Sequence, residues 1–304
     1  MTWRHEVKAF VERRVIWSGI PRGWRQLRRR NALILAYHNI MPDDVEIAGD
    51  RSLHLPRALF SAQLDSLQAT HDVVSLETLL NEEGASATRP WAVVTFDDAY
   101  RGAMTIGVRE VVARALPATV FVAPAFVGGR FFWWDVVTPS GADGPEASFR
   151  EVALHECAGV DEAVRERAER FGHRLSTLPL EAACASENDL HAAARQPGIT
   201  LASHSWSHPN LARLTRTTLE EELTRPLSWL GARFQNVLPV LSYPYGLSSP
   251  AVEKAAANAG YRAGVLVSGG WMPRRPRNPF ALPRLNVPAG LSPDGFRLRT
   301  AGLC

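Results

Sequence analysis

The chain has 304 residues, of which 46% are hydrophobic and 21% are charged, a balance typical of a folded globular protein. The formal net charge is only +3, so an extended nucleic-acid-binding surface is not expected. No apolar run reaches the roughly 18 residues of a transmembrane helix. The start of the chain also lacks an apolar stretch followed by a small-residue cleavage site, so a secretory signal is not expected. The three cysteines are odd in number and lack metal-ligand spacing, which favours a reducing compartment. We therefore expect a cytoplasmic protein.

Positive charge is concentrated at the start of the chain. Residues 1–30 contain nine arginines and lysines and only two glutamates, with aromatic and aliphatic residues between them. Such a segment either lies on an anionic membrane surface or forms a solvated helix that packs a few apolar residues on the domain. We expect residues 1–31 to form a basic helical segment, followed by a single domain over residues 32–304. Peripheral membrane contact through this segment is one of the two alternatives.

Apolar runs that end in polar or turn residues predict buried strands. They lie at residues 32–38, 72–75, 92–96, 118–123, 199–203, 237–242 and 262–267. Helical spacing of apolar residues falls between these strands, at residues 56–80, 103–115, 219–234 and 251–259. This alternation predicts an α/β protein with a parallel sheet or barrel. Residues 139–197 interrupt it and predict a helical insertion near the mouth of the barrel.

Polar residues follow three of the predicted strands, where parallel α/β folds build their sites. The first group is TFDD at residues 95–98, which puts two adjacent carboxylates directly after an apolar strand. Adjacent side chains point in different directions, so one can bind a cation while the other acts as a base. The alternative for this pair alone is a helix N-cap with a neighbouring acid.

The second group is SHSWSH at residues 203–208, which places His204 and His208 four residues apart. On one helical turn this spacing aligns both imidazoles for a metal ion. The third group is SYPYG at residues 242–246, where a tight turn can present a backbone N–H to an oxyanion, or can be a simple turn.

Together these groups supply the parts of a metal-assisted amide hydrolysis. Asp98, His204 and His208 make a three-ligand site that suits Zn²⁺, with Fe, Co, Mn or Ni as alternatives. Asp97 would act as the base towards water and the Tyr245 N–H would face the oxyanion. These three groups contain no acid to protonate the leaving amine.

The ordered set TFDD, HSWSH followed by Pro-Asn-Leu, and YPYG resembles the NodB-homology polysaccharide deacetylases, carbohydrate esterase family 4. The resemblance runs over residues 32–288 and implies a distorted (β/α) barrel of about seven parallel strands. It implies hydrolysis of N-acetyl, sometimes O-acetyl, groups on sugars. It also matches Asp97 with the base, Asp98, His204 and His208 with the metal ligands, and Tyr245 with the oxyanion-facing residue.

Two features depart from the common pattern of this family. The third motif has Ser242 where an Arg usually orients the base, and the late Leu-x-His motif is absent, with Arg284 in that region. Both departures resemble the exopolysaccharide-type branch, whose early strand ends in Tyr-His, as AYHNI does here at residues 36–40. The match implies that His38 is the general acid, although a strand-end histidine bonded to a carbonyl is the alternative. Arg284 would either orient Asp97 or bind an anionic substrate group.

The stretch RFFWWD at residues 130–135 is also similar to that branch. Trp133 and Trp134 would line the acetyl or sugar pocket, with core packing as the alternative role for one of them. Asp135 would bind a sugar hydroxyl or cap a helix.

The function expected from the sequence is that of a carbohydrate N-deacetylase acting on an acetylated glycan or glycolipid. Two alternatives remain: a same-fold hydrolase of another C–N bond, in a cyclic imide or ureide, and a catalytically silent sugar-binding relative. The second is disfavoured because a binding module has no need for a base beside a metal.

Overall fold

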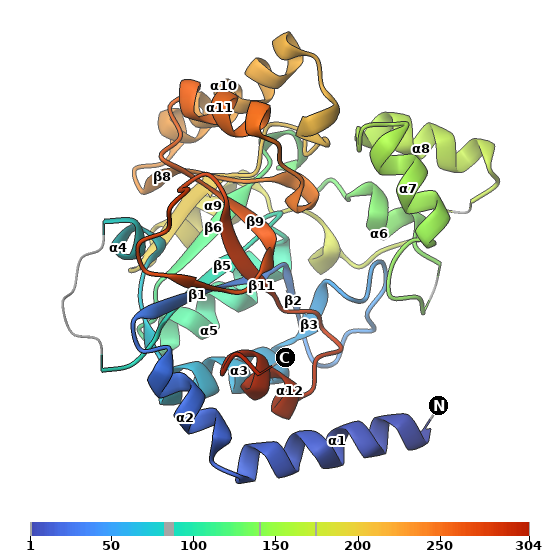
Figure 1. The fold of residues 1–304 in the computed structure, drawn as a ribbon. Coiled ribbons are helices and arrows are strands. Elements are labelled where there is room, and N and C mark those ends of the chain that lie inside the picture. The colour runs from blue at the N-terminus through green and yellow to red at the C-terminus, as the bar shows by residue number, and fades with distance from the viewer. Residues whose placement is uncertain (1, 82–87, 140, 174, 304) are drawn as a thin grey trace.

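The computed structural model describes residues 2–81, 88–139, 141–173 and 175–303. In this part of the chain, seven parallel strands close into a barrel, because the first strand pairs with β5 on one side and with β11 on the other (Figure 1). The barrel strands are β1 (Asn31–Tyr37), β5 (Trp91–Phe96), β6 (Ala118–Val122), β7 (Ile199–Ser203), β8 (Val237–Ser242), β9 (Ala263–Gly269) and β11 (Leu282–Asn286). The predicted distorted (β/α) barrel is confirmed.

Four short strands complete the sheets. β4 (Asp72–Val73) extends the barrel sheet beside β5, and β10 (Trp271–Pro273) pairs antiparallel with the start of β1. β2 (Asn39–Met41) and β3 (His54–Pro56) form a separate parallel pair directly after β1. Apolar runs in the sequence do not predict β2, β3, β10 or the barrel strand β11, because these strands are short or contain proline.

Helices cover the outside of the barrel. They are α3 (Arg57–Thr70), α4 (Leu76–Asn81), α5 (Val108–Ala113), α9 (Glu187–Ala194), α10 (Arg216–Arg233), α11 (Pro250–Asn258) and α12 (Pro293–Arg299). The helix predicted at residues 103–115 begins as a π-helical turn, Ala103–Gly107, before α5. Gly107 lies there against Phe96 and Ile40, where a Cβ would be only 3.0–3.2 Å from both side chains, so a larger residue would require these side chains to shift.

The predicted insertion contains α7 (Ala147–His155) and α8 (Asp161–Arg170), preceded by the short α6 (Trp133–Val137). Figure 1 shows these helices to one side of the barrel. The last helix of the predicted range, α9, instead packs on β7 as one of the helices that surround the barrel. The extra structure therefore lies ahead of α9.

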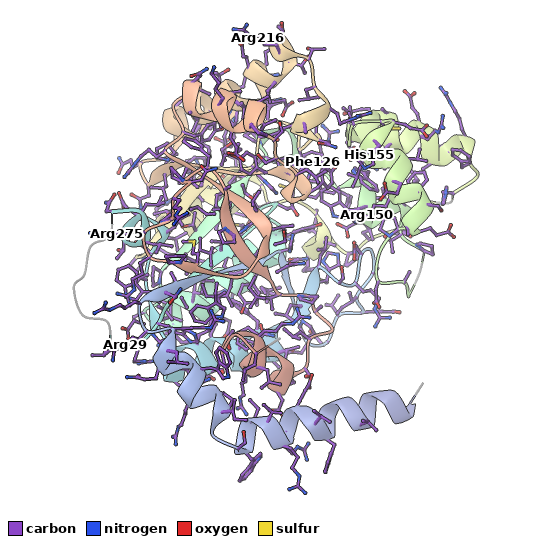
Figure 2. The ribbon with its side chains drawn as sticks, viewed as in Figure 1. Arg29, Phe126, Arg150, His155, Arg216 and Arg275 are labelled. Carbon is purple, nitrogen blue, oxygen red and sulfur yellow. The ribbon has the colours of Figure 1, made fainter. Side chains whose placement is uncertain are left out.

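The N-terminal segment forms two helices, α1 (Thr2–Trp17) and α2 (Ile20–Leu27), that lie along one side of the molecule (Figure 1). α1 packs on α12, and α12 packs on α3. Side chains fill the barrel and the layer between strands and helices (Figure 2). No helix in the described part of the chain is long and apolar enough to cross a membrane.

His71 connects the end of α3 with the C-terminal helix. Its Nε2–H donates to the carbonyl of Thr300 at 3.1 Å, and its Nδ1 lies 2.8 Å from the Thr70 hydroxyl. The ring also stacks on Trp271, with centroids 5.8 Å apart. Burial, together with the nearby Arg25, lowers the pKa of His71 to about 3, so the folded protein holds this imidazole neutral.

This burial predicts acid lability at one residue. Above pH 6.5 the folded and unfolded chains both carry a neutral His71, whereas between about pH 6.5 and 3 only the unfolded chain takes up the proton, so stability falls as the pH drops. The free energy of unfolding, measured with urea, should fall between pH 7 and pH 5 in the wild type. We expect this fall to be about 2 kcal/mol smaller in His71→Gln. Equal losses in the two proteins would show that His71 is not held neutral.

Candidate functional site

Turns at the carboxyl ends of the barrel strands bring the predicted site residues together. Asp97 and Asp98 follow β5, His204 and His208 follow β7, and Tyr245 follows β8. These turns contain left-handed residues that are not glycine. Of the seven such residues in the described ranges, five lie here: Asp98, Ala99, Ser205, His208 and Tyr245, with φ between 48° and 67°. Strained backbone of this kind is frequent where side chains must be aimed at a common point.

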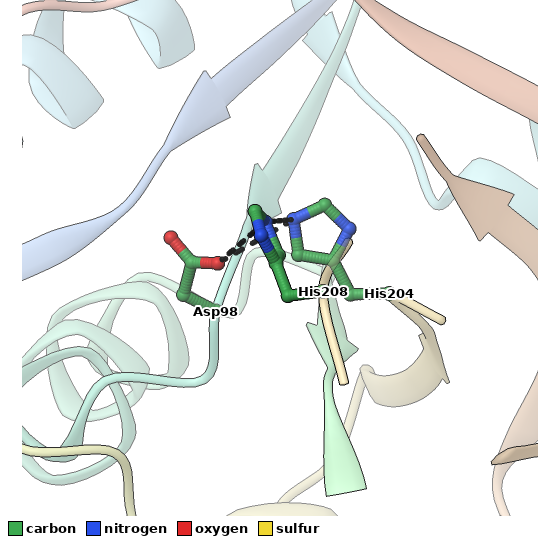
Figure 3. Close-up of side chains that lie close together, drawn as sticks. All are labelled: Asp98, His204 and His208. Atoms are coloured by element: carbon green, nitrogen blue, oxygen red, sulfur yellow. Dashed lines mark hydrogen bonds and ion pairs between the residues drawn. The ribbon is translucent and has the colours of Figure 1, made fainter. Parts of the chain in front are cut away.

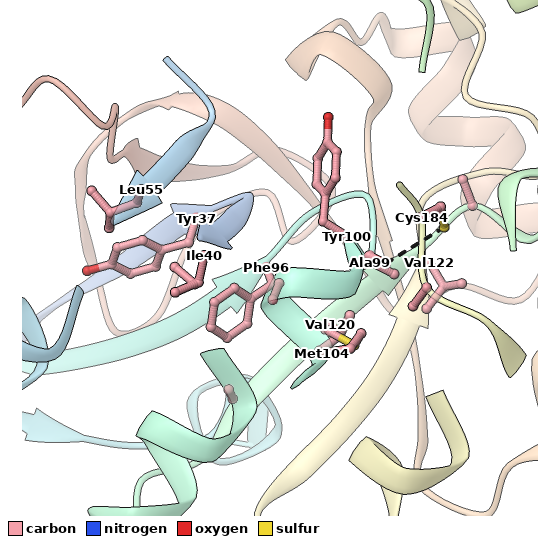
Figure 4. Close-up of a cluster of buried hydrophobic side chains, with 14 of the residues drawn as sticks. Tyr37, Ile40, Leu55, Phe96, Ala99, Tyr100, Met104, Val120, Val122 and Cys184 are labelled. Atoms are coloured by element: carbon pink, nitrogen blue, oxygen red, sulfur yellow. Dashed lines mark hydrogen bonds between the residues drawn. The ribbon is translucent and has the colours of Figure 1, made fainter. Parts of the chain in front are cut away.

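The turn after β5 is supported from below by an apolar cluster (Figure 4). Tyr100 and Phe96 are fully buried in this cluster, and Cys184 lies beside the turn with its thiol towards the carbonyls of Asp98 and Ala99. Burial raises the pKa of the Cys184 thiol, so it stays protonated and can donate. The packing fixes the backbone from which both carboxylates project.

Three predicted metal ligands converge on one point (Figure 3). His204 Nε2 and His208 Nε2 lie 3.1 Å apart, and Asp98 Oδ1 lies 3.5 Å from the first nitrogen and 3.3 Å from the second. The expected helical turn is wrong, because residues 204–210 are irregular and Ser205 and His208 are left-handed. The two imidazoles meet through this bent turn, and not through helical periodicity.

The electrostatics of this cluster fit a cation. Asp98 Oδ1 is buried and has no hydrogen-bond partner in the described part of the chain. Burial raises the pKa of Asp98 well above its ordinary value, and the neighbouring Asp97 and Asp135 raise it further. Burial lowers the pKa of both His204 and His208, so both imidazoles are neutral. A buried carboxylate beside two neutral imidazoles lacks a positive charge, and a divalent ion would supply it.

One of the two imidazoles is oriented by a backbone contact. His204 Nδ1 lies 2.8 Å from the carbonyl oxygen of Ser242, which can only accept, so Nδ1 carries the proton. Its Nε2 therefore turns an unprotonated lone pair towards Asp98 and His208. Metal-binding histidines characteristically have such a second partner.

Asp97 is held by Arg284, which projects from β11. The two carboxylate oxygens receive Nη1 at 2.8 Å and Nη2 at 2.6 Å, and the Ser242 hydroxyl contacts both the guanidinium and Asp97. Burial alone would raise the pKa of Asp97, but the Arg284 guanidinium outweighs it and keeps the pKa below its ordinary range. Of the two expectations for Arg284, the geometry favours orientation of Asp97. The side chain is only 1% exposed and does not line the cavity, so it is not placed to contact a substrate.

A cavity of about 380 Å³ opens above these residues. His38, Asp97, Asp98, His204, His208, Tyr245 and Trp134 all contribute to its lining. His38 follows β1, and none of the described residues hydrogen-bonds to its ring, so the carbonyl-bonded alternative is not observed. Burial lowers the pKa of His38 to about 4, against the opposing influence of Asp97.

Aromatic rings form one wall around His208. The Tyr245 ring meets it edge-on with centroids 4.6 Å apart, and the Trp134 ring lies 4.9 Å away. Trp133 is enclosed behind this wall, where its indole N–H donates to the Tyr245 hydroxyl at 2.9 Å. Trp134 therefore reaches the cavity as predicted, whereas Trp133 takes the packing role.

Asp135 neither faces the cavity nor caps a helix. It is fully buried, and its oxygens accept from His54 at 2.9 Å and from the Tyr100 hydroxyl at 2.6 Å. The Tyr100 hydroxyl in turn accepts from the Trp134 indole at 2.9 Å. Asp135 thus anchors the aromatic wall to the β2–β3 region, and both expectations for it are wrong because this network uses its whole carboxylate.

Sequence reasoning missed several cavity residues. Asp50 and Ser52 lie in the loop before β3, and Asp143 and Arg150 belong to the insertion. None of these residues lies in a motif or at a predicted strand end, so no sequence signal marked them. Asp50 accepts from the Ser52 backbone and hydroxyl through Oδ1 only, and its second oxygen has no partner among the described residues.

A closed (β/α) barrel with an Asp-His-His cluster at its strand ends defines a class of α/β proteins with a candidate hydrolytic metal centre. The chain belongs to the polysaccharide deacetylase family, since the model of that family matches residues 84–264. The resemblance inferred from the three motifs is thereby confirmed at the family level. One relative, YxkH of Bacillus subtilis (strain 168), whose name places it among these deacetylases, is 31% identical over 101 residues. That match spans 33% of this chain and 36% of the relative, about a third of each.

Solved structures show the same fold at low sequence identity. The Streptococcus pyogenes deacetylase PplD, solved in complex with acetate, has a TM-score of 0.60 at 16% identity, over 87% of this chain and 96% of that one. IcaB from Ammonifex degensii has a TM-score of 0.60 at 15% identity, over 90% and 98% of the two chains. A de-N-acetylase from Aggregatibacter actinomycetemcomitans has a TM-score of 0.61 at 12% identity, over 88% and 99%.

The Asp97–Arg284 pair predicts non-additive unfolding free energies. Arg284→Met leaves Asp97 as an unpaired buried charge and should cost about 3–5 kcal/mol in urea unfolding. Adding Asp97→Asn removes that charge, so the double variant should be less destabilised than the sum of the two single variants. Arg216→Met, at a fully solvated position on α10, is the control and should have little effect. Additive costs would mean that the pair does not interact.

Proposed function

We propose that this protein is a metal-dependent hydrolase that removes N-acetyl groups from amino sugars of a polysaccharide or a glycan precursor. The observation that carries the proposal is the meeting of three ligand atoms beside a separately held carboxylate, Asp97, at the base of a cavity. Membership of the polysaccharide deacetylase family supports the same class of reaction.

Asp98, His204 and His208 would hold the metal ion. One carboxylate and two imidazoles suit Zn²⁺, with Fe, Co, Mn or Ni as alternatives. When bound, such an ion lowers the pKa of water and polarises the acetamide carbonyl. The chain supplies the orientation of these ligands, through the Ser242 carbonyl on His204 and the aromatic rings around His208.

Asp97 is the proposed base. Arg284 keeps its carboxylate ionised and fixes its plane, so it is ready to accept a proton from the attacking water. It lines the same cavity as the three ligands, with Oδ2 3.9 Å from His204 Nε2. The Tyr245 backbone N–H, on the left-handed turn after β8, is the proposed donor to the oxyanion.

His38 is the proposed acid towards the leaving amine. An unperturbed imidazole has a pKa of about 6.5, whereas burial lowers the pKa of His38 to about 4. The ring is therefore neutral at pH 7, so in the proposed relay it takes up the proton that Asp97 accepted from the attacking water and passes that proton to the leaving amine. His38 lines the same cavity as Asp97 and the three ligands, which supports a relay between them.

The substrate is proposed to be a glycan or glycolipid whose sugar packs on Trp134. Aromatic rings bind the apolar faces of sugars, and the free Asp50 oxygen on the cavity wall is an acceptor for a sugar hydroxyl. A cyclic imide or ureide would use the same metal ligands, so only a substrate comparison separates the two. A silent binding protein is disfavoured, because it gains nothing from a buried charge pair that orients Asp97.

The direct test is acetate release from N-acetylglucosamine oligomers, measured after chelation and after adding back each metal. We expect activity only with metal. Asp97→Asn should abolish turnover while metal content persists, and His204→Ala should lose both, because only the second change removes a ligand. His155→Ala, an exposed histidine paired with Glu151 on α7, is the matched control and should keep both. Cleavage of a cyclic imide or ureide without acetate release would contradict the proposed substrate class, and metal-bound protein without turnover of either would indicate a binding protein.

His38→Ala tests the relay separately. Loss of a group that transfers protons in the transition state should lower kcat by on the order of a hundredfold or more, with metal content unchanged. A rate within about threefold of the wild type would rule out His38 as the acid, since that loss is far below the usual contribution.

A further inference from the structure

The N-terminal helices expose an unusual amount of apolar surface. Of the ten large hydrophobic side chains exposed among the described residues, seven belong to α1 and α2. We define the N-terminal apolar face by Val7, Phe10, Val11, Trp17, Ile20, Trp24 and Leu27. Trp17 is 83% exposed and Leu27 is 77% exposed, and exposed apolar side chains concentrated on two consecutive helices are typical of an interaction surface.

Most of this face in α1 points away from the barrel. Glu12 lies on the inner side, where it is buried and accepts from the Ser292 hydroxyl at the start of α12. At about 100° per residue, Val7, Phe10 and Trp17 lie about 140–220° around the axis from Glu12. Figure 2 shows side chains projecting from the side of α1 that faces away from the body of the protein. In α2, Ile20, Trp24 and Leu27 follow at spacings of four and three and share one side.

Positive charge surrounds the apolar face. Between residues 7 and 30 the only acidic residue is the buried Glu12, whereas seven arginines occur: Arg13, Arg14, Arg22, Arg25, Arg28, Arg29 and Arg30. Arg14 lies over the Phe10 ring at 5.1 Å and Arg28 over the Trp24 ring at 5.8 Å. The side chains of Arg4 and Lys8, which add to the basic count in the sequence, lie outside the described residues.

A groove of about 740 Å³ lies beside this face, between the α1–α2 corner and α3. Trp17, Arg22 and Arg25 line it. Asp65 on the opposite wall is already paired with Arg114 at 2.7 Å, and no described carboxylate pairs with Arg22 or Arg25. Burial lowers the pKa of Arg25, and the like charge of Arg22 also lowers it, so this part of the groove is positively charged.

We propose that α1 and α2 dock on an anionic lipid bilayer, with the apolar face in the interface and headgroup phosphates at the groove beside Arg22 and Arg25. Tryptophan and aliphatic side chains enter the interfacial layer while arginines remain at the level of the phosphates. A second copy of the chain is a poor partner for the same face, because two-fold pairing would oppose seven arginines with seven arginines. This inference does not depend on the proposed deacetylase activity.

The test is flotation of the full chain with two kinds of vesicles, phosphatidylcholine alone and phosphatidylcholine mixed with phosphatidylglycerol. We expect binding to the mixed vesicles only, weakening as salt is raised. Trp17→Ser/Leu27→Ser should weaken binding on the order of tenfold or more, and Arg22→Gln/Arg25→Gln should weaken it as well. Phe171→Ser, a 61% exposed apolar side chain elsewhere, and Arg216→Gln are the matched controls and should bind like the wild type.

The proposal would be overturned by no binding to either vesicle, by equal binding to both, or by full binding by Trp17→Ser/Leu27→Ser. A dimer on a vesicle-free sizing column that dissociates in Trp17→Ser/Leu27→Ser would assign the face to a second copy and would also overturn it. Each variant should keep its metal content and its rate on a soluble substrate, because the face lies outside the cavity residues. A variant that loses vesicle binding but keeps its metal content and its rate tests the membrane proposal alone. Its result does not depend on whether the deacetylase proposal holds.

Discussion

Two adjacent carboxylates are buried at the end of β5, and the site depends on how each of them is compensated. Asp97 has its own cation in Arg284, which binds both of its oxygens. Asp98 has none, and its Oδ1 faces two neutral imidazoles. Since an uncompensated buried carboxylate is costly, this asymmetry supports the two roles proposed above, an ionised base for Asp97 and a metal ligand for Asp98.

Barrel closure makes this separation possible. Asp97 comes from β5 and Arg284 from β11, which are far apart in the sequence and both pair with β1. Only a closed sheet brings the last strand beside the first and lets the guanidinium reach the carboxylate from behind. The same closure leaves the strand ends on one side, where the insertion and the β2–β3 region enclose the cavity.

Much of the site could be predicted because it lies in short ordered motifs at strand ends. Asp97, Asp98, His204 and His208 are close in sequence to long apolar runs, and such runs identify buried strands well. The way in which His204 and His208 meet could not be predicted, since it depends on left-handed turns and not on helical spacing. The sequence left two roles open for Arg284, orientation of Asp97 or binding of a substrate anion. It could not decide between them, because β11 is short and contains a proline, so its place beside β1 was not predicted. Asp50 and Arg150 had no signal at all, since they reach the cavity through loops and an insertion whose positions depend on tertiary packing.

The most direct measurement is a crystal structure of the zinc-loaded protein with anomalous scattering recorded at the zinc absorption edge. The account predicts one strong peak at bonding distance, about 2.0–2.3 Å, from Asp98, His204 and His208, with Asp97 still bound to Arg284 and outside the coordination shell. A peak that lies on other residues, or recruits Asp97 away from Arg284, would contradict the division of roles. So would an absence of any peak at saturating zinc.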